Sequence, residues 1–491
     1  MTESVRALLL DKEYGRMFSY FNDIAAIPRP SHQEKAVSDY LVEFAKKYDL
    51  EYYQDEMYNV IIIREASEGR ENDDPIILQG HMDMVCEKNP KCAKDMNRDG
   101  LDIDVDGDFI YAKGTSLGAD DGVAIMIALT ILSDDRLSHP RLEFVCTTCE
   151  EVGVEGANFM DVSPLKGRKL INLDNEIEGE FLAGCAGGGV NTLTIDLKPK
   201  NQYFGKAVAI ELAGLKGGHS GADIDKDRGN AMYMMAGVLK ELIDEGYRIH
   251  LGNFRGGSKS NAIPRSCIVN MMLSADRMEG LKPISEILYG MQERLHEKWG
   301  DREPEAEILW RSSTETTDIA YSFESSKKVV DLLLAEPNGV CEMNEFIPGL
   351  VETSLNLGIT ELSNNTFKAV YSMRSGNVKS FDELLERMNT IADEIGAEHV
   401  LSGRYSPWEY VNESSFRDNL VALYEDMFAK KPRVCTIHAG VECGCFSKKM
   451  PGLDCVSIGP DIYDIHSPNE RLSISSTKRM YDFVKKAVET C

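Results

Sequence analysis

The chain has 491 residues, enough for two to four domains at about 100–200 residues each, which excludes a small disulfide-stapled fold. Lysine and arginine number 54 against 81 aspartates and glutamates, for a net charge of −27, so nucleic acid is not an expected partner. No run approaches the roughly 20 apolar residues that span a bilayer, and the first residues lack the pattern of a secretory signal. We therefore expect a cytoplasmic protein with no membrane partner.

The 12 cysteines are scattered along the chain and include Cys491. In a reducing compartment this distribution predicts free thiols. Cys146 and Cys149 have the spacing of a redox pair, but the apolar run that contains them predicts a buried strand and a structural role. Cys443 and Cys445 are too close together for an ordinary metal site and are expected to be reduced.

Helical and strand patterns alternate in the first part of the chain. Amphipathic periodicity predicts helices over residues 17–25 and 34–48. Short apolar runs predict buried strands at residues 60–63, 76–78, 142–145 and 170–173. Residues 122–133 are apolar almost all round, which is typical of a buried helix. This order predicts an α/β domain with a largely parallel sheet, whose ligands bind beyond the carboxyl ends of the strands.

A glycine-rich segment at residues 184–189 marks a change in pattern and is expected to be a hinge. Alternating strands and helices of an α+β type follow, and the first pattern returns after about residue 404. The sequence therefore predicts a discontinuous catalytic domain, residues 1–187 and 405–491, with an inserted domain at residues 188–404.

Acids and an imidazole follow several of the predicted elements in succession. They are His81 and Asp83, Asp120, Glu150 and Glu151, and Asp174. Taken singly, each has a plainer interpretation: His81 and Asp83 as a hydrogen-bonded pair at a strand end, and Asp120 as a helix N-cap. Taken together, they predict a metal site at one edge of the sheet.

His466, in a turn before the last predicted helix, adds a second imidazole. Carboxylates and imidazoles without a thiolate suit Zn²⁺, Mn²⁺ or Co²⁺, and one bridging carboxylate can hold two such ions roughly 3.5 Å apart. The residues therefore predict a two-metal hydrolase.

Eight motifs, in chain order, resemble the di-zinc peptidase family that includes aminoacylase, bacterial carboxypeptidase G, PepV and carnosinase. They are QGHMDMVCEKN, GTSLGADDGVAIM, TTCEEVGVEGA, INLDNE, GGHSGADI, SNAIPR, HAGVECG and DIHSPNE. The resemblance covers essentially the whole chain and implies a di-metal peptidase with an inserted lid domain. It implies hydrolysis of small unblocked dipeptides, with histidine favoured at the C-terminal position, by a monomer or homodimer.

The resemblance also implies roles for the predicted metal-site residues. One metal ion is held by His81 and Asp174, the other by Glu151 and His466, with Asp120 bridging, Asp83 orienting His81 and Glu150 as general base. Zinc is the expected metal, with manganese or cobalt as alternatives. Asp121 departs from the closer relatives, which have asparagine, but it is not a ligand position.

In the inserted domain, the resemblance implies that His219 stabilises the oxyanion and that Asn261 and Arg374 bind the substrate's C-terminal carboxylate. Glu442 is a candidate for binding the α-ammonium group. The plainer interpretations are a loop histidine at His219, a surface charge at Arg374 and a solvated loop acid at Glu442.

Three other functions remain open on the sequence alone. A tripeptidase or an N-acyl amino acid deacylase would use the same metals on a different substrate. A non-catalytic peptide- or metal-binding protein is disfavoured, because the proposed base Glu150 stands beside the proposed ligand Glu151. A thiol redox protein would lose its activity on alkylation and retain it in chelator.

Overall fold

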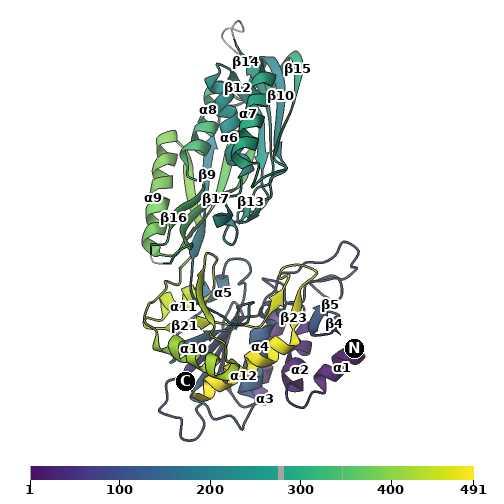
Figure 1. Ribbon diagram of the computed structural model, residues 1–491, viewed down its shortest axis with the longest axis vertical. Coiled ribbons are helices and arrows are strands. Elements are labelled where there is room, and N and C mark those ends of the chain that lie inside the picture. Colours follow the sequence, from purple (N-terminus) through teal and green to yellow (C-terminus); the bar gives the residue numbers. More distant parts are fainter. Residues whose placement is uncertain (1, 275–280, 346, 491) are drawn as a thin grey trace. The chain divides into compact units, whose positions relative to one another are not determined.

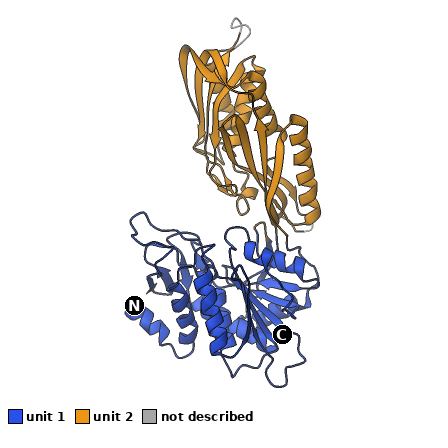
Figure 2. Cartoon of the chain, turned by 180° about the vertical axis from the view of Figure 1, so that it is seen from behind, with its two compact units in different colours: residues 1–185, 408–436, 440–491 blue, residues 186–407, 437–439 orange. Residues whose placement is uncertain are grey.

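The computed structural model describes residues 2–274, 281–345 and 347–490, so Cys491 lies outside the described residues. The chain divides into two compact units (Figure 2). Unit 1 comprises residues 1–185, 408–436 and 440–491, and unit 2 comprises residues 186–407 and 437–439. Over the described ranges, no helix combines the length and apolar character needed to cross a membrane.

The main sheet of unit 1 brings four strand ends to one edge. Its strands are β1 (Glu51–Gln54), β2 (Val60–Arg64), β3 (Ile76–His81), β6 (Leu142–Thr147), β7 (Lys169–Asn172), β8 (Glu180–Cys185), β20 (Arg433–Ile437) and β21 (Asp454–Ser457). Among the described residues the order is β1-β2-β6-β3-β7-β21-β8-β20. The central strands β6, β3, β7 and β21 are parallel, whereas β1, β2 and β8 pair antiparallel with their neighbours. The carboxyl ends of the parallel strands therefore lie along the same edge.

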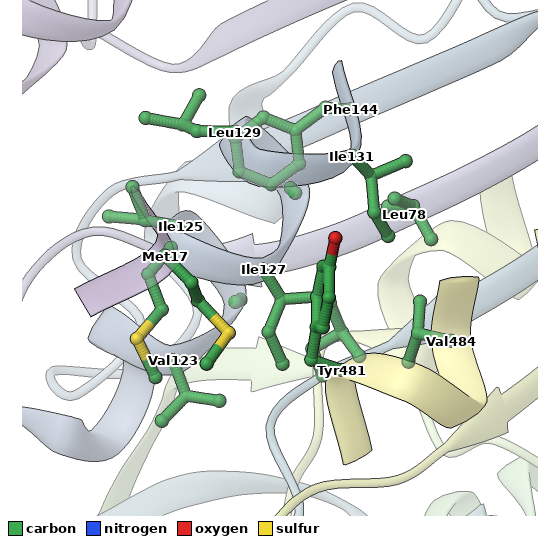
Figure 3. Close-up of a cluster of buried hydrophobic side chains, with 14 of the residues drawn as sticks. Met17, Leu78, Val123, Ile125, Ile127, Leu129, Ile131, Phe144, Tyr481 and Val484 are labelled. Atoms are coloured by element: carbon green, nitrogen blue, oxygen red, sulfur yellow. The ribbon is translucent and has the colours of Figure 1, made fainter. Parts of the chain in front are cut away.

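Unit 1 also contains helices, several of which pack against this sheet. They are α1 (Glu3–Leu9), α2 (Gly15–Ala25), α3 (Lys35–Lys47), α4 (Ala119–Leu132), α5 (Glu155–Phe159), α10 (Ser415–Phe428), α11 (Cys443–Lys449) and α12 (Ile474–Thr490). Every residue of α4 is buried, and this helix packs against α2 and β3 (Figure 1). Figure 3 shows its isoleucines and leucine among Leu78 and Phe144 of the sheet and Val484 of α12. An all-apolar helix must be buried on every side, so the predicted buried helix is confirmed.

A small second sheet in unit 1 carries the loop with His466. Its strands are β4 (Ile103–Asp106), β5 (Phe109–Ala112), β22 (Ile462–Tyr463) and β23 (Arg471–Ser473). Within the described chain they are ordered β22-β23-β5-β4. The turn between β22 and β23 contains His466 at a positive φ of 54°.

Unit 2 is built on a mainly antiparallel sheet. Its strands are β9 (Gly187–Asp196), β10 (Asn201–Ala213), β12 (Arg248–Gly256), β14 (Cys267–Ser274), β15 (Glu307–Ala320), β16 (Gly339–Met343), β17 (Val351–Ser363), β18 (Thr366–Ser375) and β19 (Glu398–Tyr405). The helices are α6 (Ala231–Asp244), α7 (Ile284–Trp299), α8 (Phe323–Ala335) and α9 (Val378–Ile395), with a 3₁₀ turn η1 (Ile224–Lys226). The short strands β11 (Gly218–His219) and β13 (Ala262–Ile263) pair with each other.

The glycine-rich segment that was expected to be a hinge lies in two strands, the end of β8 and the start of β9. A Cβ atom at Gly187 would lie 2.4 Å from the nitrogen of Pro407, and one at Gly188 would lie 2.6 Å from the hydroxyl of Tyr405. These glycines are therefore required by close packing of neighbouring backbone and side chains.

The expectation that Cys146 and Cys149 share one buried strand is wrong for Cys149. Cys146 lies in β6, but that strand ends at Thr147, and Cys149 follows in a turn with a φ of 52°. All the cysteines that the structure describes are free thiols, as the sequence predicts.

Candidate active site

The edge of the main sheet gathers the predicted site residues of unit 1. His81 is the last residue of β3, Asp174 follows β7, and Asp120 lies at the start of α4. Glu151 follows β6. Parallel strands that end in polar residues, beside the first turn of a buried helix, therefore place these side chains together.

Asp120 lies between the two histidines. Its Oδ1 is 3.0 Å from Nε2 of His81, and its Oδ2 is 3.1 Å from Nε2 of His466. Asp174 Oδ1 is 3.5 Å from the same nitrogen of His81, and Glu151 Oε2 is 3.0 Å from that of His466. Each half of the cluster thus has one imidazole, one carboxylate of its own and one oxygen of Asp120.

Asp83 contacts three parts of this cluster. Its Oδ1 lies 3.4 Å from Nδ1 of His81, and it accepts the backbone N–H groups of Glu150 at 3.0 Å and Glu151 at 3.3 Å. The Ser31 hydroxyl donates to Asp83 at 2.8 Å. Although burial opposes ionisation, His81 and these donors hold the pKa of Asp83 below its usual range. A single buried carboxylate therefore orients the imidazole and the loop with both glutamates.

The cluster carries more buried negative charge than its own histidines balance. Burial, with the charges of Asp120 and Glu151, raises the pKa of Asp174 to about 6. Burial also raises the pKa of Glu150 well above its usual range. At His466, burial lowers the pKa, but Asp120 and Glu151 outweigh it and raise the value to about 11. Such a group of desolvated acids is stabilised by a cation.

The donor atoms suit divalent metal ions. Donor atoms of His81, Asp120 and Glu151 all lie within 4.8 Å of one another, as do those of His81, Asp121 and Asp174. Glu151 Oε1 is buried and has no hydrogen-bond partner among the described residues. Zinc, manganese and cobalt bind carboxylate oxygens and imidazole nitrogens, which are the donor atoms present here. The unpartnered Glu151 oxygen is one of them.

Asp121 lies in the second of these groups, although the sequence interpretation gives it no ligand role. Its Oδ2 accepts the backbone N–H of His81 at 3.1 Å, and its Oδ1 accepts that of Ala124 at 3.2 Å. Both oxygens therefore contact backbone donors that link β3 to α4.

Glu442 is fully buried, so the interpretation as a solvated loop acid is wrong. Its Oε2 accepts hydrogen bonds from Gln79 Nε2 at 2.5 Å and from the Thr147 hydroxyl at 2.7 Å. Oε1 has no partner among the residues that the structure describes. Burial raises the pKa of Glu442 to about 7.

In unit 2, His219 lies in β11, where its Nδ1 accepts the backbone N–H groups of Gly221 at 3.2 Å and Ala222 at 3.1 Å. In the neutral ring these contacts assign the proton to Nε2, which is then a hydrogen-bond donor. The backbone carbonyl of Asn261 accepts the N–H of Ser220 at 2.8 Å, so Asn261 lies beside the His219 segment.

Arg374 lies in β18 and only 8% of it is exposed, so the interpretation as a surface charge is wrong. Its Nη1 donates to the hydroxyl of Tyr405 at 3.0 Å, while Nε has no partner among the described residues. In the described part of the chain, no hydrogen bond joins Arg374 to Asn261, the other proposed carboxylate-binding residue.

Two further residues that support the cluster have no counterpart in the sequence predictions. Glu470 accepts the backbone N–H groups of Leu117, Gly118 and Ala119, at 2.7, 3.0 and 2.8 Å, just before Asp120. Arg29, a fully buried arginine, donates to the backbone carbonyls of Met82, Asp83 and Gly118. Both side chains form hydrogen bonds with backbone atoms, and such contacts leave no pattern in the sequence. Glu470 does lie in the DIHSPNE motif, which was the available signal.

Comparison with known proteins gives consistent results. The sequence profile of peptidase family M20/M25/M40 matches residues 77–490. The chain is 34% identical to the cytosol non-specific dipeptidase of Escherichia coli over 461 residues, 94% of each protein. It is similar to the crystal structure of aminoacylhistidine dipeptidase from Vibrio alginolyticus, with a TM-score of 0.85, 32% identity and coverage of 98% and 99% of the two chains. Aminopeptidase PepT from Bacillus cereus shares the fold, with a TM-score of 0.53, 14% identity and coverage of 96% and 97%.

Proposed function

This chain belongs to peptidase family M20/M25/M40, and on that basis we propose that it hydrolyses unblocked dipeptides and favours histidine at their C-terminal position. The names of the relatives from E. coli and V. alginolyticus support a dipeptide substrate, and the second also supports the histidine preference. The observation that carries the proposal is Asp120, whose two oxygens face two histidines at 3.0 and 3.1 Å.

As a metallopeptidase, the enzyme uses divalent metal ions, and we propose two of them, with zinc as the first candidate and manganese or cobalt as alternatives. His81 and Asp174 would hold one ion, Glu151 and His466 the other, and Asp120 would contact both. Bound ions of this kind polarise a carbonyl group and make water more acidic.

The proposed general base is Glu150. Its backbone is fixed by the hydrogen bond to Asp83, and its neighbour Glu151 is used as a ligand. Glu150 accepts a proton from the attacking water and donates it to the leaving amine as the peptide C–N bond breaks. Asp83 acts by positioning both His81 and Glu150.

The other predicted roles are part of the same proposal. His219 donates from Nε2 to the oxyanion, Asn261 and Arg374 bind the C-terminal carboxylate, and Glu442 binds the α-ammonium group. Residues 188–404 form the lid domain, and the enzyme works in the cytoplasm as a monomer or homodimer.

A metal and substrate panel tests this proposal. Protein freed of metal by a chelator should not hydrolyse any dipeptide, and added Zn²⁺, Mn²⁺ or Co²⁺ should restore hydrolysis. Among Xaa-His dipeptides, other dipeptides, tripeptides and N-acyl amino acids, kcat/KM should be highest for Xaa-His. Full activity in metal-free protein would contradict the mechanism, and a preference for tripeptides or N-acyl amino acids would replace the substrate assignment.

A further inference from the structure

Unit 1 contains a second group of metal-binding side chains that shares no residue with the candidate active site. Donor atoms of His32, Cys149 and Glu155 all lie within 4.8 Å of one another. Cys149 Sγ is 3.3 Å from Nδ1 of His32. On its other side, the same sulfur is 3.2 Å from Oε1 of Glu34. Three donor side chains therefore lie close together, and Glu34 lies beside the sulfur of one of them.

Two segments hold these side chains in place. His32 and Glu34 precede α3, while Cys149 lies in the loop that follows β6 and Glu155 is the first residue of α5. Glu34 Oε1 also accepts the backbone N–H of Cys149 at 3.0 Å, and the Cys149 carbonyl accepts the N–H of Glu155 at 3.1 Å. The two segments are thus joined at the sulfur by hydrogen bonds.

The group has a buried and an exposed side. Cys149 and Glu34 are only 3% and 2% exposed, whereas His32 and Glu155 are exposed. A small ion can therefore reach the exposed pair from solvent and be held from below by the buried pair.

The donor spacing agrees with tetrahedral zinc. With a Zn–S bond of about 2.3 Å and a Zn–N bond of about 2.0 Å, tetrahedral angles place sulfur and nitrogen about 3.5 Å apart. The observed separations from sulfur, 3.3 Å to nitrogen and 3.2 Å to oxygen, are close to this edge length. One thiolate, one imidazole and carboxylates are also a ligand type that zinc and Co²⁺ prefer over Mg²⁺ or Ca²⁺.

The charges point the same way. Among the residues that the structure describes, neither Glu34 nor Glu155 forms an ion pair with a basic side chain within 4.0 Å. Burial and Glu34 raise the pKa of the Cys149 thiol to about 12, so the thiol keeps its proton when no ion is bound. A divalent cation that binds here would displace this proton and neutralise the charges of the thiolate and of Glu155.

We propose that His32, Cys149 and Glu155, with Glu34 beside the sulfur, form an additional cation site for zinc or a chemically similar divalent ion. The loop that this site would fix, residues 149–155, begins with Cys149 directly before Glu150 and Glu151. An ion here would hold the loop that positions the proposed base and one proposed ligand of the active site.

Cobalt titration of the full chain tests this site without relying on hydrolysis. A thiolate bound to Co²⁺ gives a near-ultraviolet charge-transfer absorption, and the proposed active-site ligands include no thiol. Chelator-treated wild-type protein should develop this absorption as Co²⁺ is added to saturation, with one thiolate-bound ion per chain. Cys149→Ser should abolish it, and His32→Ala should weaken Co²⁺ binding at this site about tenfold or more.

Cys435→Ser is the matched control, because Cys435 is a half-buried free thiol outside the group; it should keep the absorption. Absence of the band in wild-type protein at saturating Co²⁺, or its persistence in Cys149→Ser, would overturn the proposal. If Cys149→Ser does not fold, the same titration of Glu155→Gln and His32→Ala tests the site, because both side chains are exposed. Each variant should then bind Co²⁺ at this site more weakly than the wild type. The band needs no substrate, so an inactive protein that shows it would contradict the proposed function alone.

Discussion

The candidate metal ligands of unit 1 contact one another, whereas His219 and Arg374 of unit 2 contact nearby backbone amides or a neighbouring side chain. In unit 1, His81, Asp120 and His466 form a chain of contacts at 3.0 and 3.1 Å. In unit 2, His219 binds two backbone amides and Arg374 binds the Tyr405 hydroxyl. Parallel strands end at one edge of a sheet, but antiparallel strands end alternately at both, which accounts for this difference.

The comparison separates two kinds of role. The acids of unit 1 repel one another in a buried cluster and need a cation, so changing them should alter metal binding and the chemical step. Arg374 and His219 are held without any cation, so changing them should alter the choice of substrate and leave the metal content as it is.

The largest effect is expected for Glu150→Gln. Glutamine has the same shape but accepts no proton, so kcat should fall by about 10²–10⁴-fold with both metal ions retained. Turnover of an Xaa-His dipeptide and elemental analysis of the same protein sample measure the two quantities.

Glu151→Gln is the comparison variant, because Glu151 Oε2 lies 3.0 Å from His466. It should lose one metal ion per chain. If the two variants have equal metal content and equal activity, the assignment of base and ligand within this pair is wrong.

Asp83→Asn tests the positioning role within unit 1. The amide would keep the contact with Ser31 but would no longer be a charged acceptor for His81 and the two backbone amides. Metal affinity should fall by about 10–100-fold, as measured by competition with a chromophoric chelator. Asp161→Asn, which changes an exposed aspartate bonded locally to Ser163, should leave the affinity unchanged. Equal affinity in both variants would remove Asp83 from this role.

The sequence predicted the acids of unit 1 because each lies directly after a buried apolar strand or, for Asp120, at the start of a buried apolar helix. Such apolar elements are the most readable pattern in a chain. The buried helix α4 and the strands β3, β6 and β7 lie where they were expected. Glu470 and Arg29 could not be found in this way, because they bind backbone atoms of residues far away in the sequence. The spacing of apolar residues along the chain carries no information about such side chain–backbone contacts.

Cys149 shows a second limit. The apolar run around Cys146 does not reveal that the strand ends at Thr147, because element boundaries depend on tertiary contacts such as the hydrogen bond between Glu34 and the Cys149 N–H. Burial of Arg374 and Glu442 was likewise not readable, since charged residues are exposed in most proteins.

For unit 2, Arg374→Ala should change substrate preference. A dipeptide amide lacks the carboxylate that Arg374 is proposed to bind, and loss of such a bond costs about 2–5 kcal/mol when the partner is buried. Wild-type kcat/KM should therefore fall by at least about tenfold from the acid to the amide. In the variant, kcat/KM for the acid and for the amide should be nearly equal, and the metal content should stay the same. An unchanged ratio would exclude Arg374 from substrate binding.

The smallest expected effect concerns stability and lies wholly within unit 2. Glu336 follows α8, is 1% exposed, and neither of its carboxylate oxygens has a partner among the described residues. Burial raises its pKa from 4.5 to about 8, against a smaller opposite effect of Arg387. Between these values the unfolded chain has lost the proton and the folded chain still holds it. The folded state is therefore favoured at low pH and loses stability as the pH rises to about 8.

Glu336→Gln removes this titration, because the amide stays neutral in both states. Since one pKa unit corresponds to about 1.4 kcal/mol, the free energy of unfolding of the wild type should fall relative to the variant by more than about 1 kcal/mol between about pH 5 and about pH 8. Urea unfolding of both proteins at the two pH values measures the difference. Glu293→Gln, at an exposed position of α7, should follow the wild type. If Glu336→Gln also follows the wild type, the buried carboxyl is charged in the folded protein, and the contrast with the cation-dependent acids of unit 1 would not hold for this residue.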